Sequence, residues 1–134
     1  MVQYWAILTE AEMRTRNHIN SGGMPQFANF KLKFIPSCNH DGINVVAEWE
    51  DPTDDRWLEA IKIGVDRFVS CRKESGRPVC KTTLIMKKVI SHPIDTTEQF
   101  VSYRIDSILY EIFNQHESPV DGPDMAPDKV NDSV

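Results

Sequence analysis

The residues best suited to chemistry gather in one short turn that contains Ser91, His92 and Asp95. A serine, a histidine and an acid are the side chains of a nucleophilic triad, but a triad also needs convergence in space and an oxyanion hole. The sequence has no Gly-x-Ser-x-Gly elbow and no other nucleophile signature. We therefore predict that the turn is not an enzyme site.

The same turn suits anion binding. Asp95 and Glu98 form the pattern of a capping box at the start of a helix. A helix N-terminus presents unpaired backbone N–H groups and the positive end of a dipole, which favour a phosphate. Lys87 and Lys88 precede the turn and add two weak, salt-sensitive phosphate contacts. The alternative is an ordinary capped helix with an exposed histidine and a solvated lysine pair.

Cofactor and metal chemistry has no recognisable pattern in this sequence. Cys38, Cys71 and Cys80 match neither a disulfide framework nor a C-x-x-C metal knuckle, so we expect reduced, structural cysteines. The histidines show no ligand spacing with one another or with these cysteines. A Gly-x-x-x-x-Gly-Lys-Ser/Thr loop is missing, which predicts that no nucleotide is bound. We expect neither a cofactor nor a metal ion.

Length and charge set broad limits. The 134 residues fit one domain, and the net charge is −5. Residues 117–134 carry five acids and one base, which leaves only −1 on the rest of the chain, so RNA binding is not excluded. No apolar run approaches the roughly 20 residues that span a bilayer, and no basic leader precedes the first apolar residues. We therefore expect a cytoplasmic protein without membrane contact.

Hydrophobic periodicity predicts two strands and a helix before residue 76. Apolar residues alternate with polar ones from Phe30 to Pro36 and again from Ile43 to Trp49, which indicates two half-buried strands. The turn residues Asn39 to Gly42 between them predict an antiparallel hairpin. From Trp57 to Val69 the apolar residues recur every three or four positions, as on one side of a helix that ends near Ser75.

A third strand and a second helix follow. Alternation from Cys80 to Lys87 predicts the strand. The second helix is expected to start at Asp95 and to bury an apolar stripe from Val101 to Ile112. The order from Phe27 onward is then β-β-α-β-α.

Several residues have expected structural roles. Gly64 in mid-helix costs about 1 kcal/mol relative to alanine, so we expect it to allow close packing of the helix on the sheet. Gly76 and Pro78 mark the turn between the first helix and the third strand. Trp49 and Trp57 flank an acidic turn that would repel phosphate, so we predict core edges rather than base-stacking platforms.

The two ends of the chain are less regular. Tyr4 to Leu8 has the pattern of an edge strand, and Thr9 with Glu12 has that of a capped short helix ending before Asn20. We divide the chain into an N-terminal strand or short helix at 1–19, a domain at 20–116 and an acidic disordered tail at 117–134.

Four patterns in this order resemble domain IV of translation elongation factor G. They are the glycine-pair loop Ser21–Phe27 running into the strand Lys31–Pro36, Gly64 inside a helix, Gly76-Arg77-Pro78 before a strand, and His92–Glu98. The last segment is similar to the family's His-x-x-Asp-Ser-Ser-Glu stretch. The spacings of twelve residues from Gly64 to Gly76 and sixteen from Gly76 to His92 are also similar. The resemblance extends over about residues 20–115.

The resemblance implies an α+β fold of the ribosomal protein S5 domain 2-like type. This fold has a β-β-α-β-α core, a sheet covered on one face by two helices and a left-handed βαβ crossover, against the general preference for the right-handed form. In such a fold the strand after the Ser21-Gly22-Gly23 loop and the strand that leads to His92 run antiparallel. The loop and the turn are therefore expected at the same end of the domain.

The family places this domain in the ribosomal decoding site during translocation. The resemblance implies a free-standing, non-catalytic domain that contacts ribosomal RNA or a translation partner through two tip loops and a lysine pair: Ser21, Gly22, Gly23, Lys87, Lys88, Ser91, His92 and Asp95. Two departures stand out. Met24-Pro25 replaces a basic residue and a third glycine, and the segment Ser37–Asp55 is shorter than the family's. The alternative is a reused scaffold that binds a protein partner or a second copy of itself, without RNA.

Overall fold

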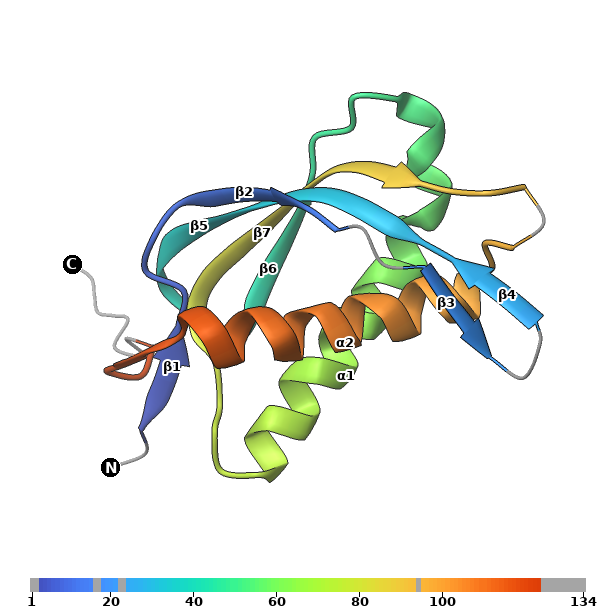
Figure 1. The fold of residues 1–134 in the computed structure, drawn as a ribbon. Helices are drawn as coiled ribbons and strands as arrows, with labels where there is room; N and C mark the ends of the chain where they lie inside the picture. The colour runs from blue at the N-terminus through green and yellow to red at the C-terminus, as the bar shows by residue number, and fades with distance from the viewer. Residues whose placement is uncertain (1–2, 16–17, 22–23, 94, 124–134) are drawn as a thin grey trace.

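The long strand β5, Asn29–Asp41, lies inside a mixed sheet. The computed structural model describes residues 3–15, 18–21, 24–93 and 95–123. β5 pairs in antiparallel fashion with β2 (Ala11–Arg14) on one side and with β7 (Cys80–Ile90) on the other. β6 (Ile43–Ala47) pairs with β7 in parallel. The four strands therefore lie in the order β2-β5-β7-β6 (Figure 1).

The predicted hairpin between the strands at 30–36 and 43–49 is wrong. β5 and β6 do not pair, because β7 lies between them. The connection contains Gly42, whose φ of +72° is the left-handed conformation that glycine adopts readily. The Gly42 N–H donates to the carbonyl oxygen of Val79 at 3.0 Å, so the chain crosses the start of β7 at this point. The alternation located the strands and their faces, but not their partners.

Two helices lie on one side of the sheet (Figure 1). α1 (Leu58–Glu74) continues from a short 3₁₀ helix η1 (Pro52–Trp57), and α2 is Glu98–His116. The chain is thus an α+β fold with the predicted element order β5-β6-α1-β7-α2. No helix in the described part of the chain has the length and apolar character of a membrane span.

The C-terminus of α1 explains why Gly76 and Pro78 follow it. Gly76 has φ +80°, and its N–H donates to the Lys73 carbonyl oxygen at 3.2 Å. The Arg77 N–H donates to the Arg72 carbonyl oxygen at 2.9 Å. This pair of bonds is a Schellman motif, which satisfies the last carbonyl groups of the helix. Pro78, which has no N–H, then separates helix from strand.

Gly64 serves helix–helix packing rather than the predicted packing of helix on sheet. A Cβ atom placed on Gly64 would lie 2.4 Å from the carbonyl oxygen of Ser102 and 3.2 Å from the Cβ of Ile105. Both residues belong to α2. A side chain at this position would therefore force α1 and α2 apart.

The core lies between the helices and the sheet face that they cover. The predicted apolar faces meet there, and the largest fully buried side chains are Phe30, Phe34, Phe68, Phe113, Leu32, Ile61, Leu84, Met86, Ile105, Leu109, Val65 and Val79. The Phe68 and Phe113 rings have centroids 5.2 Å apart. Trp57 is part of this core and Trp49 packs against it, as predicted.

The N-terminal residues belong to the same fold. β1 (Tyr4–Ala6) confirms the predicted edge strand, and its Trp5 N–H donates to the Pro78 carbonyl oxygen at 2.9 Å. The short helix expected from Thr9 is wrong, because residues 11–14 form β2 at the edge of the main sheet. Backbone pairing with β5 outweighs the weak local preference for a helix.

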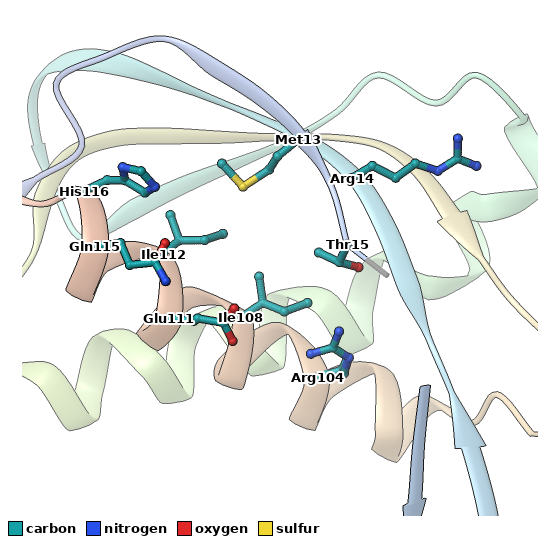
Figure 2. A pocket seen from close by; sticks show the side chains of 9 residues that line it. All are labelled: Met13, Arg14, Thr15, Arg104, Ile108, Glu111, Ile112, Gln115 and His116. Atoms are coloured by element: carbon teal, nitrogen blue, oxygen red, sulfur yellow. The ribbon is translucent and has the colours of Figure 1, made fainter. Parts of the chain in front are cut away.

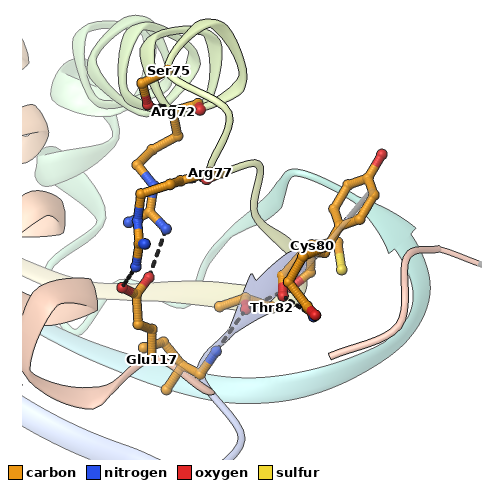
Figure 3. Close-up of polar contacts among 9 residues, drawn as sticks. Arg72, Ser75, Arg77, Cys80, Thr82 and Glu117 are labelled. Atoms are coloured by element: carbon orange, nitrogen blue, oxygen red, sulfur yellow. Dashed lines mark hydrogen bonds and ion pairs between the residues drawn. The ribbon is translucent and has the colours of Figure 1, made fainter. Parts of the chain in front are cut away.

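The segment that follows α2 is also structured. β8 (Ser118–Val120) pairs with β1, and Glu117 forms ion pairs with Arg72 at 2.6 Å and with Arg77 at 2.5 Å (Figure 3). The predicted disordered tail therefore does not begin at 117, because buried charge pairing and backbone pairing hold this segment in place. Residues 124–134 lie outside the described residues. The boundaries at 19/20 and 116/117 fall inside the fold.

Candidate functional site

The turn between β7 and α2 is fixed by the hydroxyl group of Thr96. This oxygen accepts a hydrogen bond from the His92 N–H at 2.7 Å and donates to the carbonyl oxygen of Phe27 at 2.5 Å. The Phe27 N–H donates to the Asp95 carbonyl oxygen at 3.1 Å, and the Thr96 N–H donates to that of His92 at 3.1 Å. The turn is thereby tied both to itself and to the end of β4 (Met24–Phe27).

These bonds place the end of β4 beside the turn. β4 forms a hairpin with β3 (His18–Ser21), in which Ser21 pairs with Met24. Gly22 and Gly23 lie outside the described residues. The β3–β4 hairpin and the turn leave the sheet at the same end (Figure 1), as expected. The contact between them is made by Phe27, at the base of the hairpin.

His92 and Asp95 face one another across the turn. His92 Nδ1 lies 3.4 Å from Asp95 Oδ2, and the Asp95 N–H points at the same nitrogen at 3.3 Å. A neutral Nδ1 can accept from the N–H, whereas a protonated Nδ1 pairs with the carboxylate. The side chain of His92 is 52% exposed, so a ligand can reach the ring.

The predicted capping box at Asp95 is wrong. The N-cap of α2 is Thr97, which has an extended backbone and whose hydroxyl accepts from the Phe100 N–H at 3.1 Å. Threonine is a favoured N-cap residue. The Asp95 carboxylate instead lies beside the His92 ring. The helix therefore begins at Glu98, so Ser91, His92 and Asp95 form a turn that precedes the helix N-terminus instead of lying on it.

A pocket of 310 Å³ opens beside this turn. It is lined by Ser91, His92, Pro93 and Thr96 and, from η1, by Arg56 and Trp57. The guanidinium carbon of Arg56 lies 4.8 Å from the centre of the Trp57 ring, a cation–π arrangement that orients the charge. Within the described residues, the buried Nε1 of Trp57 has no hydrogen-bond partner. Sequence reasoning missed Arg56, because η1 carries it to the site and the periodicity gives no sign of η1.

Lys87 does not line this pocket. It lies at a break in register, since Leu32 faces Met86 while Lys31 faces Lys88. Lys87 is the extra residue of this bulge, and its Nζ pairs with Glu48 Oε1 at 3.2 Å. Because Met86 faces the core, strand alternation places Lys87 on the open face of the sheet, where its partner is Glu48, so this lysine does not extend the turn as we expected.

The open face of the sheet is a ladder of paired charges. Lys31 pairs with Glu50 at 2.5 Å and Lys33 with Glu10 at 2.9 Å. The hydrogen bond to Glu50 raises the pKa of Lys31, and the bond to Lys31 lowers the pKa of Glu50, with Lys88 nearby as a smaller contribution. Lys31, Lys33 and Lys87 thus each have an acidic partner, which reduces the basic surface that this face offers to RNA.

Comparisons with known proteins show a similarity of fold. No family model and no curated protein matches this chain. A crystal structure from Thermus thermophilus, whose name states no activity, is similar with a TM-score of 0.68 and 16% sequence identity. The similarity covers 87% of this chain and 18% of that protein. In the Thermus protein this architecture is therefore one part of a much longer chain.

Proposed function

We propose that this chain is a non-catalytic binding domain that contacts ribosomal RNA through the pocket beside the His92 turn. The observation that carries the proposal is the convergence of Arg56, Ser91 and His92 on one hollow, next to the base of the β3–β4 hairpin. An exposed arginine is well suited to a phosphate group, because its planar donors match two phosphate oxygens. A hydroxyl and an imidazole add further donors.

The resemblance to domain IV of elongation factor G supports the proposal, and so does the arrangement of elements. The parallel β6–α1–β7 unit, the sheet order and the two helices on one face fit a ribosomal protein S5 domain 2-like fold. A left-handed crossover of this unit is part of the proposal. The ion pairs of Lys31, Lys33 and Lys87 on the open sheet face favour RNA contact at the pocket and the hairpin instead.

Co-sedimentation of the full chain with ribosomes tests this function. The chain should pellet at low salt, and the affinity should fall as salt rises. The double variant Arg56→Ala with His92→Ala should bind more weakly and show a salt slope smaller by about one to two. Lys73→Ala is the matched control, because this exposed lysine lies at the other end of α1.

Two results would contradict the proposal. The first is a supernatant that retains all of the protein at low salt. The second is pelleting that does not depend on salt, or on Arg56 and His92, which would indicate a protein partner and the reused-scaffold alternative. The control guards against a general effect of net charge, since Lys73→Ala removes one positive charge without touching the pocket.

A further inference from the structure

A groove runs between β2 and the face of α2 that turns toward it (Figure 2). It consists of two adjoining hollows of 240 and 260 Å³, which share Met13, Ile112 and His116 as walls. None of its lining residues belongs to the pocket beside the His92 turn. The groove is therefore a separate site, and its role is independent of the proposed function.

Arg104 lies at one end of this groove and is only 2% exposed. Figure 2 shows its side chain rising from α2 toward Thr15. Its Nη2 donates to Asn29 Oδ1 at 3.4 Å, a long and weak bond, and its buried Nε has no partner within the described residues. A guanidinium has five N–H donors, and within the described residues the bond to Asn29 is the one that Arg104 forms.

The contrast with the other buried arginine is informative. Arg72 is 3% exposed and has both the Glu117 carboxylate and the Arg77 carbonyl oxygen as partners. In the described part of the chain, no ion pair involves Arg104. Burial lowers the pKa of Arg104, and Glu111 opposes this more weakly, yet an arginine remains charged. Glu111 lines the same hollow without forming an ion pair with Arg104 in the described part of the chain, and a buried cation without a bonded anion is costly, so the guanidinium can still take an anionic ligand.

The other end of the groove is apolar. Ile7, Ala11 and Phe34 line it, and Met13 with Ile112 connects it to the Arg104 end. A ligand that fits both ends has one anionic head and an apolar chain. A carboxylate matches the planar donors of a guanidinium, and one buried cation balances a single negative charge. We propose that this groove binds a small monocarboxylate with an apolar chain, its head on Arg104 and its chain extending toward Phe34.

Titration of the full chain with octanoate, followed by ¹H–¹⁵N NMR, tests the site. Octanoate should cause saturable shifts in the amides of β2 and the second half of α2. Octanamide has the same chain without the charge, and it should bind about 10- to 100-fold more weakly, because hydrogen bonds to charged groups are the stronger ones. Equal binding of the two probes, or no saturable shift at millimolar octanoate, would overturn the proposal.

Two variants test the two ends of the groove separately. Arg104→Met should weaken octanoate by a similar 10- to 100-fold and should still fold, since replacing a buried unpaired ion by an apolar side chain is often neutral or stabilising. Ala11→Phe fills the apolar end without altering Arg104 and should also abolish tight binding. Arg67→Met removes an exposed arginine of α1 and should bind as the parent does. Parental affinity in Arg104→Met is incompatible with the proposal, and if that variant does not fold, parental affinity in Ala11→Phe is equally incompatible.

Discussion

Replacement of Glu117 by alanine tests whether the segment after α2 holds the fold together. Glu117 Oε1 lies 2.6 Å from Nη2 of Arg72, which is 3% exposed. The substitution leaves a buried guanidinium with the Arg77 carbonyl oxygen as its hydrogen-bond partner, 2.7 Å from Nε. Removing one partner of a buried ion pair costs about 3–5 kcal/mol. The Arg77 side chain is 48% exposed, so its ion pair with Glu117 contributes little to stability. We therefore expect Glu117→Ala to lower the free energy of unfolding by about 3 kcal/mol.

Urea unfolding followed by circular dichroism measures this change in the free energy of unfolding. For a chain of this size the corresponding fall in Tm is roughly 10 °C. Glu74→Ala is the matched control, because this exposed glutamate at the end of α1 forms no ion pair within the described residues, and it should change stability by less than about 0.5 kcal/mol. Arg77→Ala should cost less than about 1 kcal/mol. A Glu117→Ala variant as stable as the control would refute the reasoning, and so would an equal loss in Arg77→Ala.

Three further changes have defined outcomes. Gly64→Ala should destabilise by about 1–3 kcal/mol in thermal unfolding despite the better helix propensity of alanine, because its Cβ would meet the Ser102 carbonyl oxygen; a more stable variant would contradict the close approach. Thr97→Ala should lower the free energy of unfolding by about 1 kcal/mol and Asp95→Ala by less, as measured by urea unfolding. A larger loss in Asp95→Ala would instead support Asp95 as the N-cap. Burial raises the pKa of Asp106 above its usual 3.8, so the charged form is disfavoured in the folded state. The parent should lose stability relative to Asp106→Asn as pH rises from 3.8 through the raised pKa, and parallel pH profiles of the two would count against this.

The sequence predicted those elements whose signals are local. The alternation from Phe30 to Phe34 and the three-to-four periodicity from Trp57 to Val69 gave the right elements and the right buried faces, because one side of each packs in the core. Gly76 marked the end of α1 for a reason that is also local, its positive φ. In each case a short stretch of chain carries all of the information.

What depended on distant residues was not predicted. The partner of β6 is β7, almost forty residues away, and no pattern near Ile43 encodes that choice. Likewise, the local preference of Thr9–Glu12 for a capped helix yields to pairing with β5.

The candidate site shows the same division. Ser91, His92 and Asp95 share one turn because they are neighbours in sequence. The tertiary fold brings Arg56 and the base of the β3–β4 hairpin to that turn. Of these two, the sequence predicted only the segment that forms the hairpin. Lys87 was misplaced because its ion pair with Glu48, which no pattern near Lys87 predicts, holds the side chain on the open face of the sheet.

The position of β7 between β5 and β6 has a consequence for synthesis on the ribosome. β6 has β7 as its neighbour within the main sheet, so it emerges from the exit tunnel with no strand in that sheet to pair with. It must wait until residues 80–90 have followed it out, and pairing of β1 with β8 comes later still. Such non-local pairing slows folding and leaves strand edges exposed in the meantime. A nascent chain halted before residue 80 should therefore be sensitive to protease and prone to chaperone capture, and one that has cleared residue 120 should resist both.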